Sequence, residues 1–482
     1  MATSTLTLIT VAIYLFVLFI VAKRSSNNAN NDTFFKGGRA QSTAVVAIAM
    51  IGAPITGISL ISLPGSVAAS SFSYLQFMFG VAVGYAIIAY LLVPLFYRLN
   101  VTSLYEYLDG RFGSSSHRSG AWLYFLSKTL GASLRAFVIC IVVQQLLCET
   151  LGVPFFVTAL LFIFLVWLYT HKGGVASVVW TDVLKTVCML GCIALAIFAV
   201  LQALDLSLGE AFARASERDY TQVFFFDNIN DSRHFLKSFL SGIFLIIAMT
   251  GLDQDMMQRV LSSRTQRSAQ HNMVLSSVSQ VGIIALILGL GALLHLYLVE
   301  TNQSVAKPDD VFAYVAGCEG VPKMLSVLLV LGIVSASFSA TGSALTSLTT
   351  SFTTDILGGA KGRSESHLTR VRECVHIAMA VIIMAMLLVL ERWSSDSVIN
   401  IYYRFAGYTY GPLLGLFAFG LFSKRSVRDR LVPVVVILAP IISALLDHYS
   451  KQLFGGYEFG FELMLVTSAL TIFGLALISR KQ

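Results

Sequence analysis

The segment GAPITGISLISLPG, residues 52–65, lies inside an apolar run long enough to cross a bilayer, yet it contains three glycines and two prolines. A helix in lipid must satisfy its backbone N–H and C=O groups internally, so such breakers are tolerated only where the freed groups meet protein, water or a bound ion. Unwinding between Gly52 and Thr56 would release carbonyl oxygens, which can bind a hard cation. The alternative is that the glycines serve only helix packing, because they let membrane helices approach closely.

A second apolar run, residues 322–350, is rich in hydroxyl groups. Ser335, Ser339 and Ser343 recur every four residues, which places them on one helical face, and Thr346 and Thr350 extend that face. Serines and threonines in membrane helices also bond to their own backbone or join helices. A run this dense favours an ion path.

Asp182 lies inside the apolar run 175–203. A carboxylate in a membrane is costly to bury unpaired, so it marks a candidate functional site. The alternative is an acid favoured by the helix dipole and paired with Lys185, three residues further on.

Arg135 lies well inside another apolar run, seven residues after Lys128 and on nearly the same helical face. An arginine at such a depth can bind a carboxylate with two parallel hydrogen bonds. A structural arginine that pairs with a carbonyl or reaches the surface is the alternative.

The composition is that of a membrane protein. Of 482 residues, 56% are hydrophobic and only 12% are charged, with a mean hydropathy of +0.77, whereas soluble domains carry about 25% charged residues. Repeated apolar stretches predict an all-α polytopic membrane protein. Loop lysines and arginines that set orientation explain the net charge of +7, so no nucleic-acid partner is predicted. The six cysteines form no CxxC pair and no catalytic motif is present, so no enzyme is predicted.

Thirteen candidate spans cover residues 5–22, 43–65, 73–97, 119–147, 154–170, 175–203, 233–252, 270–298, 322–350, 368–390, 397–422, 431–447 and 460–479. Loops rich in lysine and arginine, including Arg39, the pair Lys361 and Arg363, and Lys481 in the tail, alternate with loops that are poor in them or balanced by acids. Because positive loops stay in the cytoplasm, the N-terminus is predicted outside and the C-terminus inside.

An odd number of spans fits one leading span, two five-span repeats of opposite orientation and two trailing spans. We divide the single transmembrane domain, 1–482, into a leading part (1–42), a first repeat (43–203), a second repeat (233–422) and trailing helices (431–482). The first span of each repeat is interrupted, at residues 52–56 and at Thr250-Gly251. Paired interrupted spans indicate a transport site at the repeat interface, near the bilayer midplane.

Seven segments together resemble the sodium:solute symporter family. They are FFKGGR (34–39), ISLPGS (61–66), LNVTSLYEYLDGRFG (99–113), GGVASVVWTDVL (173–184), TGLDQDMMQR (250–259), the hydroxyl-rich run ending in TTD, and GYTYGPLLGLFAFGLF (407–422). They follow the family's order over nearly the whole chain. The resemblance implies a LeuT-type core of two inverted five-helix repeats, with one leading and two trailing helices, that couples inward Na⁺ flow to solute uptake by alternating access.

The resemblance also implies ion ligands. The sodium site shared by much of the family would use the backbone carbonyls of Gly52, Ile55 and Ala336 and the hydroxyl of Ser339. Sialic acid symporters bind a second sodium through an aspartate that matches Asp182 and through serines, of which Ser339 and Ser343 match while Gly342 replaces another. One or two Na⁺ ions are therefore expected.

In the same symporters an arginine that matches Arg135 receives the substrate carboxylate. Thr56 and Ser59 would then face the solute, with Gln76 as a further polar contact. The resemblance thus implies a monomeric, multi-pass symporter of the bacterial inner membrane that imports a small organic solute, carboxylate-bearing and similar to sialic acid. A neutral sugar or polyol is the alternative solute, and a transporter-like membrane sensor is the alternative from another class.

Overall fold

The computed structural model describes residues 2–25, 30–36, 42–99, 103–144, 152–228, 231, 233–358, 364–393, 398–453, 459 and 462–480. Several predicted positions lie outside these ranges. They are the span ends at 145–147, 397 and 460–461, residues 37–39 of the FFKGGR segment, residues 100–102 of the segment at 99–113, and the basic loop residues Arg39, Lys361, Arg363 and Lys481.

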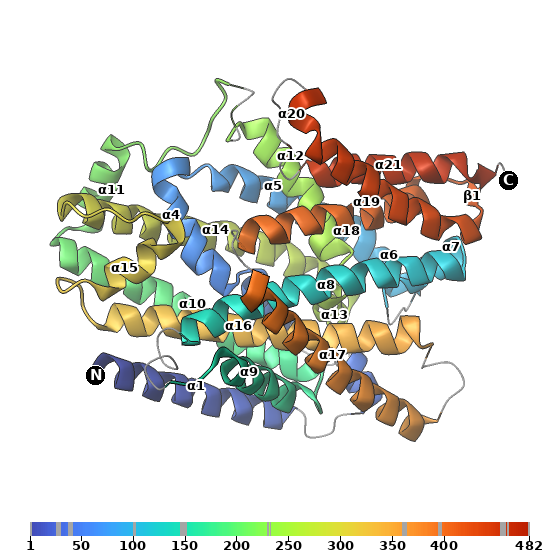
Figure 1. Ribbon diagram of the computed structural model, residues 1–482, viewed down its shortest axis with the longest axis horizontal. Helices are drawn as coiled ribbons and strands as arrows, with labels where there is room; N and C mark the ends of the chain where they lie inside the picture. The colour runs from blue at the N-terminus through green and yellow to red at the C-terminus, as the bar shows by residue number, and fades with distance from the viewer. Residues whose placement is uncertain are drawn as a thin grey trace.

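The described chain is almost entirely helical (Figure 1). Its first half contains α1 (Ala2–Ser25), α2 (Asn31–Lys36), α3 (Thr43–Gly52), α4 (Gly57–Ser70), α5 (Tyr74–Ile87), the π-helical turn η2 (Ile88–Leu92), α6 (Val93–Leu99), α7 (Glu106–Arg111), α8 (Ser114–Val143), α9 (Phe155–Thr170), α10 (Val175–Leu204) and α11 (Leu208–Glu217).

The second half contains α12 (Phe235–Ile246), the π-helical turn η5 (Ile247–Gly251), α13 (Gln254–Leu261), α14 (Gln266–Glu300), the 3₁₀ turn η6 (Pro308–Asp310), α15 (Val311–Gly317), α16 (Met324–Ser351), the π-helical turn η7 (Phe352–Ile356), α17 (Glu365–Trp393), α18 (Val398–Phe422), the 3₁₀ turn η8 (Asp429–Leu431), α19 (Val432–His448), α20 (Ser450–Leu453) and α21 (Leu463–Leu477). The short strands β1 (Ser426–Val427) and β2 (Ser479–Arg480) pair antiparallel.

Helix boundaries follow local sequence signals. Ser42 precedes α3, and its side chain accepts a hydrogen bond from the N–H of Val45. Thr265 caps α14 in the same way. Gly174, with φ of 50°, makes the turn before α10, a conformation that glycine adopts without the steric cost of a Cβ atom. These caps satisfy backbone donors that a helix leaves free at its first turn.

Every predicted span contains a helix in the described part of the chain. Nine helices there are long and apolar enough to cross a membrane, two more spans are bent helix pairs, and α9 and α21 are shorter apolar helices. The prediction of an all-α polytopic membrane protein with about 13 spans is therefore confirmed.

Both predicted interruptions are present, although the second lies at residues 252–253, directly after Thr250-Gly251, which still belong to the π-helical turn η5. The first span bends by 50° between α3 and α4, and the second by 72° between the segment Phe235–Gly251 and α13. Residues 53–56 between α3 and α4 are not helical. These breaks free backbone groups inside the protein, where partners other than lipid can satisfy them.

Helix α16 is the centre of the packing. In the apolar 18-residue stretch of its span, 83% of the residues are buried. The helix contacts α1, α4, α8, α10 and α17. Figure 1 shows the two chain ends at opposite ends of the helix stack.

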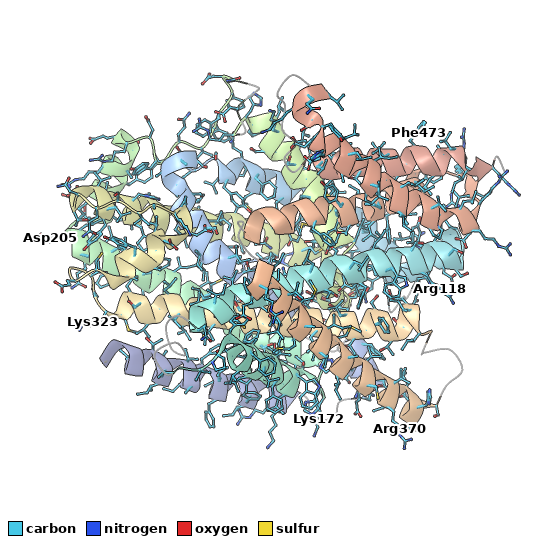
Figure 2. The ribbon with its side chains drawn as sticks, viewed as in Figure 1. Arg118, Lys172, Asp205, Lys323, Arg370 and Phe473 are labelled. Carbon is cyan, nitrogen blue, oxygen red and sulfur yellow. The ribbon has the colours of Figure 1, made fainter. Side chains whose placement is uncertain are left out.

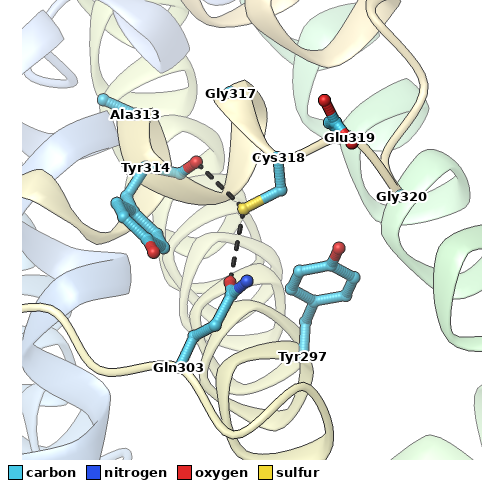
Figure 3. Close-up of a pocket in the computed structure, with 8 residues that line it drawn as sticks. All are labelled: Tyr297, Gln303, Ala313, Tyr314, Gly317, Cys318, Glu319 and Gly320. Atoms are coloured by element: carbon cyan, nitrogen blue, oxygen red, sulfur yellow. Dashed lines mark hydrogen bonds between the residues drawn. The ribbon is translucent and has the colours of Figure 1, made fainter.

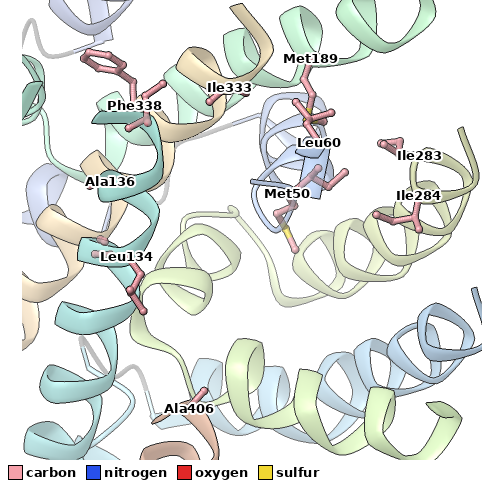
Figure 4. Packing of buried hydrophobic residues seen from close by; sticks show 14 of the residues in the cluster. Met50, Leu60, Leu134, Ala136, Met189, Ile283, Ile284, Ile333, Phe338 and Ala406 are labelled. Carbon is pink, nitrogen blue, oxygen red and sulfur yellow. The ribbon is translucent and has the colours of Figure 1, made fainter. Parts of the chain in front are cut away.

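Apolar side chains fill the space around the first break, where Met50 of α3, Leu60 of α4 and Met189 of α10 gather (Figure 4). The broken span is therefore held on several sides by the core.

The contact between α5 and α12 depends on two glycines. A Cβ atom at Gly80 would lie 2.0 Å from the carbonyl oxygen of Phe239, and one at Gly242 would lie 2.2 Å from the carbonyl oxygen of Phe77. Both obstacles are backbone atoms, which cannot rotate away as a side chain does. The two helices are therefore in direct backbone contact, as small residues permit in membranes.

We expect Gly80→Ala to destabilise the protein, because the added methyl group forces α5 away from α12 at a cost of about 1–3 kcal/mol. Thermal unfolding of the purified protein in detergent measures the loss. Gly289→Ala in α14 is the control, since a Cβ atom there meets no atom within 4 Å. Equal melting temperatures for the two variants would contradict the close contact.

Candidate functional site

Six charged side chains are buried together where α8, α10, α13 and α16 meet. Each is at most 6% exposed, and they comprise Lys128, Asp182, Lys185, Asp253, Asp255 and Arg259. Three positive charges thus face three negative charges, so the group is balanced. Charges removed from water are tolerated when they are paired and hydrogen-bonded. We call these six residues the buried charge network.

Lys128 of α8 joins the two aspartates around the second break. Its Nζ lies 3.1 Å from Asp253 Oδ1 and 2.6 Å from Asp255 Oδ2. Asp253 also caps α13 by accepting from the N–H of Met256 at 3.1 Å, and it accepts from the hydroxyl of Tyr410 at 2.6 Å. The bend after η5 is therefore fixed by a carboxylate that a cation neutralises.

Arg259 of α13 joins the other half of the network. Its Nε lies 2.6 Å from Asp182 Oδ2, and its Nη1 lies 2.9 Å from Asp255 Oδ1. Nη2 also donates to Ser343, whose hydroxyl donates to Asp255. One guanidinium thus bridges α10, α13 and α16. The planar, five-donor geometry of arginine suits such a site better than lysine does.

The residues predicted for a second sodium site are brought together, but around Arg259. Ser339 donates to Asp182 Oδ1, while Asp182 Oδ2 binds Arg259. Both oxygens of this carboxylate therefore have partners, and Ser343 contacts the same guanidinium. A Na⁺ ion at this place would share its ligands with Arg259. The assignment of this site stays a prediction.

The residues predicted for the first sodium site come from the broken span and from α16, which packs against α4. The carbonyl of Gly52 accepts from the N–H of Ile55 at 3.1 Å, which leaves it one lone pair. The hydroxyl of Ser339 donates to Asp182 and keeps its own lone pairs. Ala336 is fully buried on α16. These donor groups suit a cation, and their role as ligands stays a prediction.

Lys185 reaches the same break from α10. It is fully buried, and its Nζ donates to the carbonyl oxygen of Ala53 at 3.3 Å. The pairing of Asp182 with Lys185, an alternative from the sequence, is absent from the described hydrogen bonds and salt bridges, because Asp182 binds Arg259 instead. A buried ammonium therefore lies at the non-helical stretch of the broken span.

A side chain at position 342 would meet Tyr169. A Cβ atom at Gly342 would lie 1.7 Å from the hydroxyl oxygen of Tyr169. That hydroxyl donates to the carbonyl of Phe338 at 2.7 Å. Tyr169 of α9 thus fills the place toward which a side chain at position 342 would point.

The residues predicted to bind solute occupy different settings. Thr56 and Ser59 open α4, where the N–H of Thr56 donates to the Ser59 hydroxyl at 3.5 Å. Arg135 lies half-buried on α8, seven residues beyond Lys128 of the network. Gln76 is fully buried, and its side-chain amide donates to the carbonyl of Arg233 at 2.7 Å and accepts from the N–H of Phe225 at 3.1 Å. Gln76 therefore holds the segment before α12, and its binding role stays a prediction.

A separate pocket of about 600 Å³ lies where the C-terminal end of α14 meets α15. Figure 3 shows Cys318 between Gln303 and the backbone of Tyr314, and its Sγ donates to both at 3.4 Å. The pocket is lined by residues of α14, α15 and the segments that follow each of them, and none of its lining residues belongs to the buried charge network. This pocket is therefore not part of the candidate site.

The sequence did not identify Asp253, Asp255, Arg259 and Tyr410 as site residues. The first three belong to the run TGLDQDMMQR, where three charges follow an apolar span directly. That clustering was a usable signal, because charges next to an interrupted membrane helix need partners. Tyr410 carried no comparable signal, since its contact with Asp253 joins residues 157 positions apart.

A predominantly helical membrane chain with two broken spans is typical of the class of secondary transporters. The model of the sodium:solute symporter family matches residues 34–429. The chain belongs to this family, as its resemblance predicted, and proteins of this family are transporters, not enzymes.

Similar proteins include sodium-coupled monocarboxylate transporter 2 of Danio rerio, 25% identical over 418 residues, which cover 84% of this chain and 65% of that protein. The sodium/sialic acid symporter SiaT of Proteus mirabilis is 23% identical over 439 residues, which cover 89% of this chain and 86% of that protein. The chain spans less than two thirds of the length of its vertebrate relatives, such as the human sodium/iodide cotransporter at 63%.

Solved structures share the fold. A Na⁺-coupled sialic acid symporter in a substrate-bound, outward-open state superposes with a TM-score of 0.82 at 19% identity, covering 99% of each chain. Mhp1, a nucleobase-cation-symport-1 family transporter, gives a TM-score of 0.56 at 15% identity, covering 92% of this chain and 93% of that one. These likenesses confirm the LeuT-type fold.

We expect Arg259→Gln to destabilise the protein by about 3–5 kcal/mol, because it leaves Asp182 and Asp255 buried without their shared counter-charge. Thermal or denaturant unfolding in detergent measures the loss. Arg214→Gln is the control, since Arg214 forms an ion pair with Glu300 in which the side chains are 47% and 36% exposed, and such pairs contribute under about 1 kcal/mol.

Adding Asp182→Asn to Arg259→Gln removes one of the uncompensated charges, so part of the stability should return. If the single variant at Arg259 were no less stable than the Arg214 control, the buried pairing described above would be wrong.

Proposed function

We propose that this protein is a secondary active symporter that couples the entry of Na⁺ to the uptake of a small, carboxylate-bearing organic solute by alternating access. Membership of the sodium:solute symporter family supports the transport of a solute with sodium. The names of its relatives, which include monocarboxylate and sialic acid transporters, support an organic acid. The observation that carries the proposal is the pair of broken spans with a half-buried arginine on an adjacent helix.

The broken span offers favourable chemistry for an anion. Helix α4 begins at Gly57, and the N–H groups of its first turn and the positive end of its dipole lie inside the protein. Helix α8, which carries Arg135, packs against α4. A carboxylate between these two elements would meet a guanidinium and a helix N-terminus, and Thr56 and Ser59 would supply hydroxyl groups.

The buried charge network supports alternating access. Lys128 and Asp182 belong to the proposed first repeat (43–203), whereas Asp253, Asp255 and Arg259 belong to the proposed second repeat (233–422). The ion pairs therefore join the two repeats across their interface. A rocking motion of one repeat against the other must exchange these pairs for others or for water. The network thus acts as a latch on one side of the solute site.

The distribution of charge supports an orientation with the N-terminus outside and the C-terminus inside. Figure 2 shows two arginines, Arg118 and Arg370, at the end of the helix stack where the chain finishes, whereas at the opposite end the acid Asp205 balances the lysine Lys323. Basic residues gather on the cytoplasmic side of membrane proteins. We propose a multi-pass protein of the bacterial inner membrane that works as a monomer.

We expect a carboxylate solute, with sialic acids tested first, to raise the melting temperature of the purified protein in the presence of Na⁺. Arg135→Ala should weaken solute binding about tenfold to a hundredfold, because a hydrogen bond to a charged group contributes about 1.5–3 kcal/mol. Arg118→Ala is the matched control, since Arg118 is an exposed arginine on the same helix. A titration of melting temperature against solute concentration measures both effects.

If a neutral sugar or polyol raises the melting temperature of wild type and of Arg135→Ala equally, the assignment of a carboxylate solute is wrong and the neutral solute takes its place. Counterflow into liposomes with the same solutes then tests transport. Solute flux that is the same with and without Na⁺ would contradict the symport mechanism.

A further inference from the structure

Lys185 is the one member of the buried charge network whose hydrogen bond, among those of the described residues, goes to the backbone of the first broken span. Its Nζ donates to the carbonyl of Ala53 at 3.3 Å, and the residue is fully buried. Ala53 belongs to the four-residue stretch, 53–56, in which the helix is interrupted. The freed backbone thus already has a positively charged partner, which the chain itself supplies.

The packing of α10 against α3 sets Lys185 in this place. The hydroxyl of the next residue, Thr186, donates to the carbonyl of Ile48 at 3.1 Å. A Cβ atom at Gly52 would lie 2.0 Å from that same hydroxyl oxygen, so the backbone of α3 approaches α10 closely because residue 52 is glycine. The Lys185 ammonium is therefore held beside the break by contacts on both helices.

Among the hydrogen bonds of the described residues, none joins Lys185 to the nearby carboxylate of Asp182, so the ammonium finds its acceptor at the break. Asp182 lies one helical turn before Lys185, but its two oxygens bind Arg259 and Ser339. The ammonium therefore shares the negative charge of Asp182 with a guanidinium and takes the Ala53 carbonyl as its hydrogen-bond acceptor. An ammonium is a compact point charge that carbonyl oxygens can hold, as they hold an alkali cation.

We propose that the Lys185 ammonium is a tethered competitor of Na⁺ at the broken span: its hydrogen bond to the carbonyl of Ala53, the residue after the predicted ligand Gly52, places its charge beside the predicted sodium position, so that this stretch holds either Lys185 or the ion. The inference rests on the proposed function, because it concerns the sodium position formed by Gly52, Ile55, Ala336 and Ser339. Two unit positive charges a few ångströms apart inside a protein repel each other strongly. Lys185 must therefore withdraw when Na⁺ binds, and it keeps the break ordered when Na⁺ is absent.

This competition has two consequences for binding. The wild type binds Na⁺ more weakly than the site would without Lys185, because the ion must displace a charge that is already present. The wild type also keeps part of its solute affinity in sodium-free buffer, because the tethered ammonium orders the stretch that carries Thr56. Removal of the charge should reverse both properties.

The test compares wild type with Lys185→Gln by thermal unfolding over a range of NaCl concentrations, at constant ionic strength set with choline chloride. The half-effective Na⁺ concentration should fall at least tenfold in Lys185→Gln. Lys185→Met is a second uncharged variant, for use where the glutamine variant folds poorly. Lys323→Gln is the matched control, because it removes the same charge from an exposed lysine before α16 and should leave the sodium response of the wild type unchanged.

The proposal is overturned if both uncharged variants show the same sodium response as wild type, whether that response is present or absent. A second titration, with a carboxylate solute in sodium-free buffer, should show binding to wild type and about tenfold weaker binding to Lys185→Gln. If the variants gain sodium affinity but no carboxylate stabilises any of them, the tethered competitor stands and the proposed solute class fails. If carboxylates stabilise all variants but sodium affinity never changes, the solute class stands and the competitor fails.

Discussion

The buried guanidinium of Arg259 is the interaction on which the rest of the site depends. It contacts Asp182 of α10, Asp255 of its own helix and Ser343 of α16. In a medium where a lone buried charge costs several kcal/mol, these elements cannot separate until other partners are provided. The position of α13, and hence the 72° bend before it, follows from that requirement. Packing of apolar side chains alone would not select this angle, because lipid chains are as apolar as the helices.

The two broken spans solve the problem of freed backbone groups in different ways. At the second break the solution is a side chain, since Asp253 caps α13 and is neutralised by Lys128. At the first break the solution is a charge from another helix, since Lys185 donates to Ala53. Both solutions place an ammonium beside a break, one through a carboxylate and one directly on a carbonyl. The chain thus meets the rule that irregular backbone in a membrane must find partners largely with charges of its own.

The sequence predicted the elements better than it predicted their partners. Each span was visible because about twenty apolar residues in a row have one physical explanation, and both breaks were visible because glycine, proline or a polar cluster interrupts such a run. Asp182 was recognised as a candidate site residue, and the alternative interpretation paired it with Lys185 of its own helix, whereas the structure pairs it with Arg259, 77 residues away. Local spacing cannot predict a pairing that tertiary packing creates. Gly342 likewise looked like a missing ligand until Tyr169 was seen to fill its place.

Local order and function make opposite demands on such a site. A transport site must let an ion and a solute enter and leave, yet every backbone group there must be satisfied at each stage of the cycle. A flexible side chain with a fixed charge meets both demands. It can donate a hydrogen bond to a carbonyl in one state and withdraw from that carbonyl in another. Lysine suits this role since its charge sits on a flexible four-carbon chain, whereas the forked contacts of Arg259 suit a latch. The different placement of these two cations, one beside the freed carbonyls and one between carboxylates, is therefore a division of roles that follows from their chemistry.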